Sequence, residues 1–208
     1  ANKGLSISTA KDFDIALKGV ETDCVDINIH TGSAAADIAA VLYASQKGKK
    51  LRGGIFFDPI GELAKTGKLN RSLDCAFDEM FATASYNVKN IPAFTAIGVD
   101  TMPYSSAGAS AVEELAAAFA TAVAYIRAML ERGLAIDEAA SQIRFRVSLG
   151  GNFFMEIAKI RAARMLWAKI VSEFGGNEQS QKIKIGARTS VYNKTVFDPY
   201  VNMLRTAT

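Results

Sequence analysis

Apolar and polar residues alternate with two different periods along the chain, and this predicts five strand–helix units. Five short runs fit strands, and a segment with helical spacing of its apolar residues follows each one. The predicted strands cover residues 25–29, 54–57, 94–99, 143–147 and 183–187. The predicted helices begin after residue 33 and near residues 70, 110, 152 and 197, and a loop is expected around Gly61 and Gly67. An unbroken series of this kind predicts an α/β fold with parallel strands and right-handed crossovers.

The helix after the fourth predicted strand carries the clearest apolar stripe. Its spacing is that of one buried helical face, and its members are Phe153, Ile157, Ile160, Ala163, Trp167, Ile170 and Phe174. The basic residues of the same helix are expected on its solvated side or in an intersubunit contact; they are Lys159, Arg161, Arg164 and Lys169. In the helix before it, Ser110 and Glu113 form a capping box. The expected buried residues of that earlier helix are Val112, Leu115, Phe119, Val123, Ile126 and Leu130.

Three of the predicted strands carry polar residues on one face, although parallel strands covered on both sides are usually apolar throughout. These residues are Asp26, Asn28 and His30, then Gln142, Arg144, Arg146 and Ser148, and finally Lys182 and Lys184. They could line a wet or ligand-bearing lumen. They could instead form internal ion pairs, such as Asp26 with Arg144 or Arg146, or an exposed face of an incomplete sheet. Because a buried unpaired charge is costly, pairing is favoured where water is absent.

Composition and charge exclude several classes of protein. The chain has 208 residues, half of them hydrophobic, and a net charge of +3 without a dense basic run, which argues against a nucleic-acid partner. The sequence has no signal peptide and no apolar segment that could span a membrane. Cys24 and Cys75 are expected to be buried free thiols, which suits a reducing, cytoplasmic location.

The residues that could carry chemistry are few and scattered. His30, the single histidine, follows the first predicted strand, where barrel enzymes place their active sites, but it has no neighbouring Cys or carboxylate cluster for a metal site. Asp58 and Glu62 are a possible carboxylate pair without a third group. The pair Gly150-Gly151 is interpreted as a tight turn rather than an anion site. The residues by themselves therefore assign no catalytic, cofactor-binding or metal-binding group.

Several segments resemble the barrel domain of the methylmalonyl-CoA mutase family, the cobalamin-dependent acyl-CoA mutases. They are residues 150–170, 110–132, 135–138 and 198–206 and the pair Thr189-Ser190; the similarity is strong from about residue 92 and weaker but colinear before it. The resemblance implies a TIM-type (β/α)8 barrel, of which this chain would supply about five units. It also implies acyl-CoA along the barrel axis and adenosylcobalamin in the holoenzyme.

The departures from the family pattern concern its catalytic positions. Val99-Asp100 follows Gly98 where catalytic chains carry Tyr-His, and Phe56-Phe57-Asp58 stands where they carry Gln-Asn-Asp. The other departures are Cys75 and Gln142 in place of Arg, Arg188 in place of Gln, and Val191-Tyr192 in place of Gly-Trp. The Asp-x-His-x-x-Gly signature of the cobalamin-binding domain is also absent. This pattern resembles the small, non-catalytic subunit, whose partner would be the large catalytic chain of a heterodimer, with no catalytic or cofactor-binding residue in this segment.

Two other functions stay open at this point. An active acyl-CoA mutase of altered specificity could have recruited Asp58, Asp100 and Arg188, and an unrelated barrel enzyme or an interaction module is also possible. The chain has no initial Met and ends inside an expected helix, so residues 1–208 are expected to be a single piece of a longer barrel domain. Five units cannot close a barrel, and the exposed sheet edges predict self-association as a dimer or higher oligomer.

Overall fold

The computed structural model describes residues 4–207 and contains one five-stranded parallel sheet. The strands are β1 (Ile27–Ile29), β2 (Gly53–Phe57), β3 (Phe94–Asp100), β4 (Ile143–Leu149) and β5 (Ile185–Thr189). They lie in chain order, and every neighbouring pair is parallel. The α/β fold with five parallel strands is therefore confirmed.

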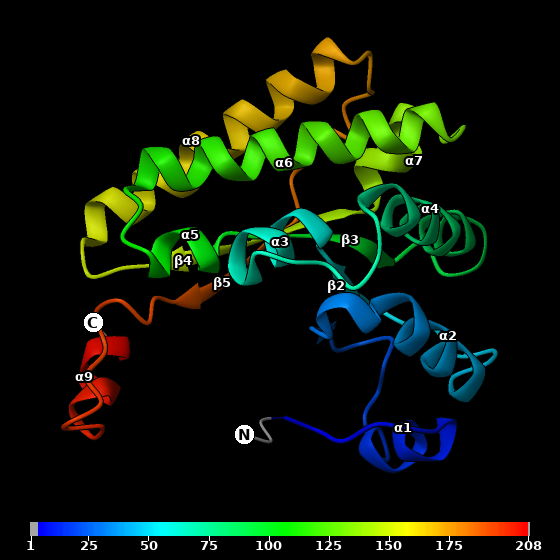
Figure 1. Ribbon diagram of the computed structural model, residues 1–208, viewed down its shortest axis with the longest axis horizontal. Coiled ribbons are helices and arrows are strands. Elements are labelled where there is room, and N and C mark those ends of the chain that lie inside the picture. Colours follow the sequence, from blue (N-terminus) through cyan, green and yellow to red (C-terminus); the bar gives the residue numbers. More distant parts are fainter. Residues whose placement is uncertain (1–3, 208) are drawn as a thin grey trace.

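Helices connect the strands and cover the sheet. They are α1 (Ala10–Ala16), α2 (Ala35–Ser45), α3 (Pro59–Thr66), α4 (Leu73–Asn90), α5 (Met102–Ser106), α6 (Ala111–Glu131), α7 (Ile136–Ser141), α8 (Phe153–Glu173) and α9 (Val201–Ala207), with a short 3-10 helix at Gly32–Ala34. Helices α6 and α8 run side by side along one side of the sheet (Figure 1). None of the helices within residues 4–207 has the length and apolarity needed to cross a membrane.

The sheet is curled, as a segment of a barrel must be. In a flat sheet β1 and β4 would lie about 14 Å apart, because neighbouring strands are spaced by about 4.8 Å. Yet Arg144 on β4 donates to Asp26 at 3.1 Å and to Asn28 on β1 at 3.2 Å. The strands must therefore bend towards each other on this face. The curl is that of a partial (β/α)8 barrel, and the predicted Asp26–Arg144 ion pair is confirmed.

The apolar core lies between the sheet and the helices. Phe145 on β4 packs edge-on against Phe119 on α6 and Trp167 on α8, with ring centroids 5.6 Å and 5.0 Å apart. The predicted stripe of α8 is right from Ile160 onwards, where its members are buried or half-buried, and wrong before it, because Phe153 and Ile157 are exposed. Val112 at the start of α6 is exposed as well. In both helices the predicted stripe begins before the first turn that reaches the core.

Three local predictions are wrong. The expected loop around Gly61 is helix α3, which Asp58 caps by accepting from the Gly61 amide and which Gly67 ends at a φ of 73°. Cys24 and Cys75 are exposed rather than buried: Cys24 precedes β1, and Cys75 lies beside the inward-facing Ala76. The last helix begins at Val201, four residues later than expected. The capping box of Ser110 and Glu113 is confirmed.

Candidate functional site

The carboxyl ends of β1 to β4 bring polar side chains from four strand–helix units to one hollow. Because the strands are parallel, their carboxyl ends share one edge of the sheet, and this edge is where barrel enzymes place their sites. The hollow holds about 390 Å³ and is lined by His30, Thr31, Gly32, Phe56, Asp58, Gly61, Glu62, Lys65, Asp100, Pro103 and Arg146. The sequence singled out His30, Asp58, Glu62 and Asp100, and the structure brings these four together.

Arg146 is the central cation of the hollow. Its Nε donates to Asp100 Oδ1 at 3.0 Å, and its Nη2 forms a second bond to the same carboxylate. Its Nη1 lies 3.1 Å from His30 Nε2. Arg146 therefore pairs with Asp100 on the neighbouring strand, not with Asp26. The Asp100 carboxylate accepts two hydrogen bonds from the planar guanidinium of Arg146 and so fixes its orientation.

His30 is a neutral side chain in this setting. Its ring stacks on Phe56 with centroids 4.2 Å apart. Burial and then the charge of Arg146 lower the pKa of His30 to about 4; Asp100 opposes this decrease, and Arg188 adds the smallest lowering effect. Because arginine can only donate, His30 Nε2 accepts from Arg146, and the ring proton lies on Nδ1. Arg188, on β5, is exposed and is not among the residues that line the hollow.

Asp58 joins four elements through its carboxylate. Oδ1 accepts from the Tyr125 hydroxyl of α6 at 2.5 Å and from the Gly61 amide at 2.9 Å, and Oδ2 accepts from the Asp100 amide of β3 at 2.8 Å. The Tyr125 oxygen itself accepts from the Ile60 amide at 2.9 Å. Burial raises the pKa of Asp58 to about 6, although these hydrogen bonds oppose the increase. The carboxylate stabilises the junction of β2, β3, α3 and α6.

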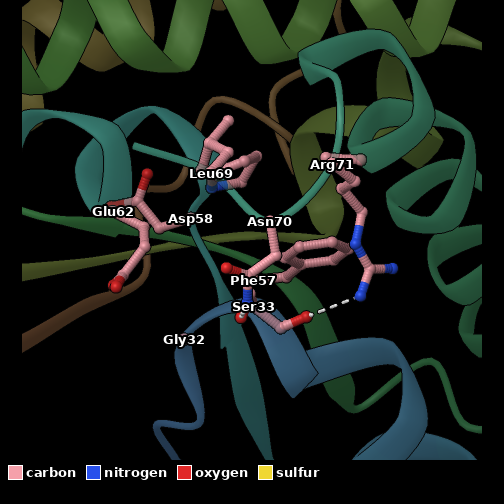
Figure 2. Close-up of a pocket in the computed structure, with 10 residues that line it drawn as sticks. Gly32, Ser33, Phe57, Asp58, Glu62, Leu69, Asn70 and Arg71 are labelled. Carbon is pink, nitrogen blue, oxygen red and sulfur yellow. Dashed lines mark hydrogen bonds between the residues drawn. The ribbon is translucent and has the colours of Figure 1, made fainter. Parts of the chain in front are cut away.

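Glu62 lines the same hollow as Asp58. A Cβ added at Gly32 would lie 3.5 Å from Glu62 Oε2, so the Glu62 carboxylate points towards the turn after β1. Figure 2 shows a smaller pocket beside this turn, with Glu62 and Arg71 on opposite sides of the view. This pocket holds only about 10 Å³, close to the space that one water needs. Arg71 Nη2 donates to the Ser33 carbonyl there at 3.4 Å.

A second polar cluster, between α6 and α8, was not found from the sequence. Lys159 was expected on the solvated side of α8, but its side chain is 1% exposed. Its Nζ lies 2.8 Å from Glu114 Oε2, 2.6 Å from Glu156 Oε2 and 2.7 Å from the Ser148 carbonyl. Glu114 also accepts from the Ser148 amide at 2.8 Å and from the Thr101 hydroxyl. The sequence contains one indication that Lys159 is buried. Lys159 lies four residues before Ala163, on the same helical face as Ala163 and Trp167.

The turn into α8 lies beside a negatively charged side chain, that of Glu156. A Cβ added at Gly150 would lie 3.2 Å from Glu156 Oε1. This carboxylate disfavours an anion at Gly150-Gly151. Among residues 4–207, no group of three or more His, Cys, Asp or Glu side chains is placed to hold a metal ion.

Comparison with known proteins assigns the chain to one enzyme family. The sequence model of the family described as methylmalonyl-CoA mutase matches residues 1–208. The chain belongs to the methylmalonyl-CoA mutase family. The small subunit of this mutase from Streptomyces virginiae is 39% identical over 196 residues, which is 92% of this chain and 31% of that protein.

Two further relatives show how widely the family pattern is shared. The small subunit from Porphyromonas gingivalis is 35% identical over 92% of this chain and 32% of its own length. The large subunit from Propionibacterium freudenreichii is 32% identical over 98% of this chain and 29% of its own length. The chain thus spans about a third of the length of these mutase relatives.

Methylmalonyl-CoA mutases use adenosylcobalamin, and the described residues of this family member do not fit that cofactor. The one imidazole, His30, is stacked on Phe56 and accepts from Arg146, so it offers no free nitrogen to a cobalt ion. The contacts from Arg144 to Asn28 on β1 and from Arg146 to His30 just after β1 cross the concave face of the sheet. Apart from Thr31, the other polar side chains that line the hollow are ionisable, and they do not match the broad, largely apolar face of a corrin ring.

Proposed function

We propose that residues 1–208 form a single piece of the barrel domain of a small-subunit-type mutase chain and that this piece is structural. It contributes no catalytic, cofactor-binding or metal-binding residue. A holoenzyme that contains a large catalytic subunit would interconvert methylmalonyl-CoA and succinyl-CoA in the cytoplasm, with adenosylcobalamin held outside this segment. The edge strands β1 and β5 would meet the remaining barrel units or another copy of the segment.

The observation that carries this proposal is that the polar side chains at the strand ends form hydrogen bonds within the chain itself. Arg146 is held by Asp100 and His30, and Asp58 accepts three hydrogen bonds from its own chain. A group that binds or activates a substrate needs a free donor or acceptor directed at the reacting atoms. The two small-subunit relatives support the same interpretation.

An active mutase or another barrel enzyme is the second candidate, and one observation favours it. A carboxyl group with a pKa of about 6, as in Asp58, can exchange a proton near neutral pH. In this alternative Asp58 and Asp100 would act in the hollow, and Arg188 would have to move towards it. The three hydrogen bonds already made by Asp58 argue for a structural role instead.

Activity and assembly assays separate the two candidates. The full-length protein that carries this sequence would be purified alone and after co-expression with a large mutase subunit. We expect no turnover of methylmalonyl-CoA or other acyl-CoAs by the chain alone with adenosylcobalamin, and a one-to-one complex by size-exclusion chromatography with light scattering. Turnover by the chain alone, lost in Asp58→Asn and kept in Glu62→Gln, would establish the active alternative.

A further inference from the structure

A second hollow lies at the amino ends of β2 and β3, at the opposite edge of the sheet from His30 and Asp58. It holds about 670 Å³ and is bordered by the last turns of α2 and α4 and by the two loops that enter the strands. Ligand pockets commonly occupy about 300–1,000 Å³. Because β2 and β3 are inner strands, both units that form this hollow are present. Barrel units added next to β1 or β5 would not fill it.

One wall of the hollow is a pair of stacked aromatic rings. Tyr43 on α2 and Tyr86 on α4 have ring centroids 5.1 Å apart and ring planes within 12° of parallel. Phe94 packs edge-on against Tyr43 and fixes the pair from behind. Tyr86 remains 47% exposed. The wall therefore offers a flat aromatic surface, bordered by the apolar side chains of Leu51 and Ile91, on which another planar ring can stack.

The hollow is also lined by a basic loop. Four cationic side chains and one acidic side chain line the hollow: Lys47, Lys49, Lys50, Arg52 and Asp23. Arg52 is partly neutralised by Asp26 at 3.4 Å, whereas Lys49 meets only the neutral Gln46 amide oxygen at 3.0 Å in the described contacts. The lysines thus present positive charge in the same hollow as the aromatic wall.

The basic loop is held in place by the segment before β1. The Thr22 hydroxyl donates to the Lys50 carbonyl at 2.7 Å, and the Arg52 amide donates to the Thr22 carbonyl at 3.1 Å. A neighbouring hollow is lined by three acidic and three basic side chains, which are Asp14, Glu21, Asp23, Lys18, Lys49 and Lys50, so it does not extend the basic loop as a net positive surface. The basic loop is therefore a confined patch, which suits a short anion better than a nucleic-acid strand.

We propose that this hollow binds a nucleoside phosphate, with the base stacked on Tyr86 and the phosphates on Lys47, Lys49 and Lys50. Base–aromatic stacking and lysine–phosphate attraction are the two interactions that its walls supply. An acidic peptide would use the charges but not the stacked rings. The inference does not depend on the proposed structural role, because the two sites lie at opposite edges of the sheet.

Calorimetric titration of the full-length protein with ADP, without a partner subunit, tests the proposal. We expect one ADP per chain. The triple variant K47Q/K49Q/K50Q and the variant Tyr86→Ala should each weaken binding about tenfold, whereas Tyr86→Phe should bind as wild type, because stacking needs no hydroxyl. The matched triple variant R161Q/R164Q/K169Q removes the same charge from exposed positions of α8 and should leave binding unchanged. Thermal unfolding of each variant confirms that it is folded.

Several outcomes would overturn the proposal. They are no ADP binding at millimolar concentration, equal affinity for inorganic phosphate and ADP, equal weakening by the matched α8 triple variant, or tighter binding of a glutamate-rich peptide than of ADP. Displacement of ADP by coenzyme A would support the site and identify the nucleotide end of a thioester as its occupant. A failure here leaves the turnover and co-elution results of the structural proposal unaffected.

Discussion

Two ion pairs near the carboxyl ends of the strands use similar chemistry in different surroundings. The Lys159–Glu114 pair is enclosed between α6 and α8, and its side chains are 1% and 2% exposed. The Arg146–Asp100 pair opens on the strand-end hollow, and its side chains are 17% and 18% exposed. The first pair is out of contact with water, whereas water can screen the second.

The difference shows how surroundings determine the role of a charged residue. The Lys159 ammonium donates to Glu114 Oε2 at 2.8 Å and to the Ser148 carbonyl at 2.7 Å, and it forms a further ion pair with Glu156. All of these partners are protein oxygens, so the pair acts within the fold. Arg146 instead borders the hollow, and any anion that entered there would meet it. Removing each cation should therefore give very different results.

The largest effect is expected for Lys159→Met. The substitution leaves the Glu114 carboxylate buried without its cation, and breaking a buried pair in this way costs about 3–5 kcal/mol. Urea unfolding of the full-length protein measures this loss of unfolding free energy. Lys169→Met, at an exposed position of the same helix, is the control and should change it by less than about 0.5 kcal/mol.

The double variant E114Q/K159M sharpens the same test. The side-chain amide introduced at position 114 keeps an acceptor for Ser148 and Thr101 but no longer buries a charge, so the double variant should be more stable than Lys159→Met alone. Additive losses from the two substitutions would show that the ion pair has no coupling energy. The structural role given to the buried Lys159–Glu114 pair, in contrast to the Arg146–Asp100 pair, would then be wrong.

A smaller loss is expected for Tyr125→Phe. The hydroxyl donates to Asp58 and accepts from the Ile60 amide, so its removal leaves that amide unsatisfied. The expected cost is about 2–3 kcal/mol of unfolding free energy. Tyr86→Phe removes a hydroxyl from an exposed ring and should cost less than about 0.5 kcal/mol. Equal effects of the two substitutions would contradict the role given to Asp58 as the junction of four elements.

The sequence predicts the sheet well because its signals are local. Short apolar or alternating runs give the approximate strand positions, and the regular succession of strands and helices gives the parallel order. The Asp26–Arg144 pair was one of two pairings that the polar face allowed. The preference for Arg144 over Arg146 depends on how the sheet curls and on Asp100 beside Arg146, and both are tertiary features.

The errors have two physical origins. Lys159 is buried because Glu114, 45 residues earlier, supplies a carboxylate at its amine, and helical periodicity carries no information about such a partner. Helix α3 differs from the sequence-based expectation for another reason, since the segment with Gly61 and Gly67 is expected to be a loop. A Cβ at Gly61 would lie 2.2 Å from Asp58 Oδ2. The glycine therefore makes room for the capping carboxylate, and the cap Asp58 and the following Pro59 were the better signals.

A moderate dependence of stability on pH is expected from Asp58. Its pKa rises from 3.8 in the unfolded chain to about 6 in the folded protein, so the folded state binds more protons between these values. Its contribution to stability is complete below about pH 4 and is lost as the pH rises through 6, on the order of 2 kcal/mol. Unfolding free energies measured from pH 4 to 7 should show this decrease in wild type and in Glu62→Gln. If Asp58→Asn showed the same decrease in unfolding free energy, a group other than Asp58 would be its cause.

The smallest effect on stability is expected for Arg146→Gln, which tests the more open pair. Because water can screen this pair, the loss of unfolding free energy should be at most about 1 kcal/mol. The charge of Arg146 is one cause of the lowered pKa of His30, so removing it should raise that pKa above 4. Burial is the largest cause and remains, so the pKa should stay below 6.5. NMR titration of this single histidine measures the shift, and Arg144→Gln, which removes the pair with Asp26, is the control. An unchanged His30 pKa in Arg146→Gln would mean that Arg146 does not control the charge of the hollow, and the contrast with Lys159 would then rest on burial alone.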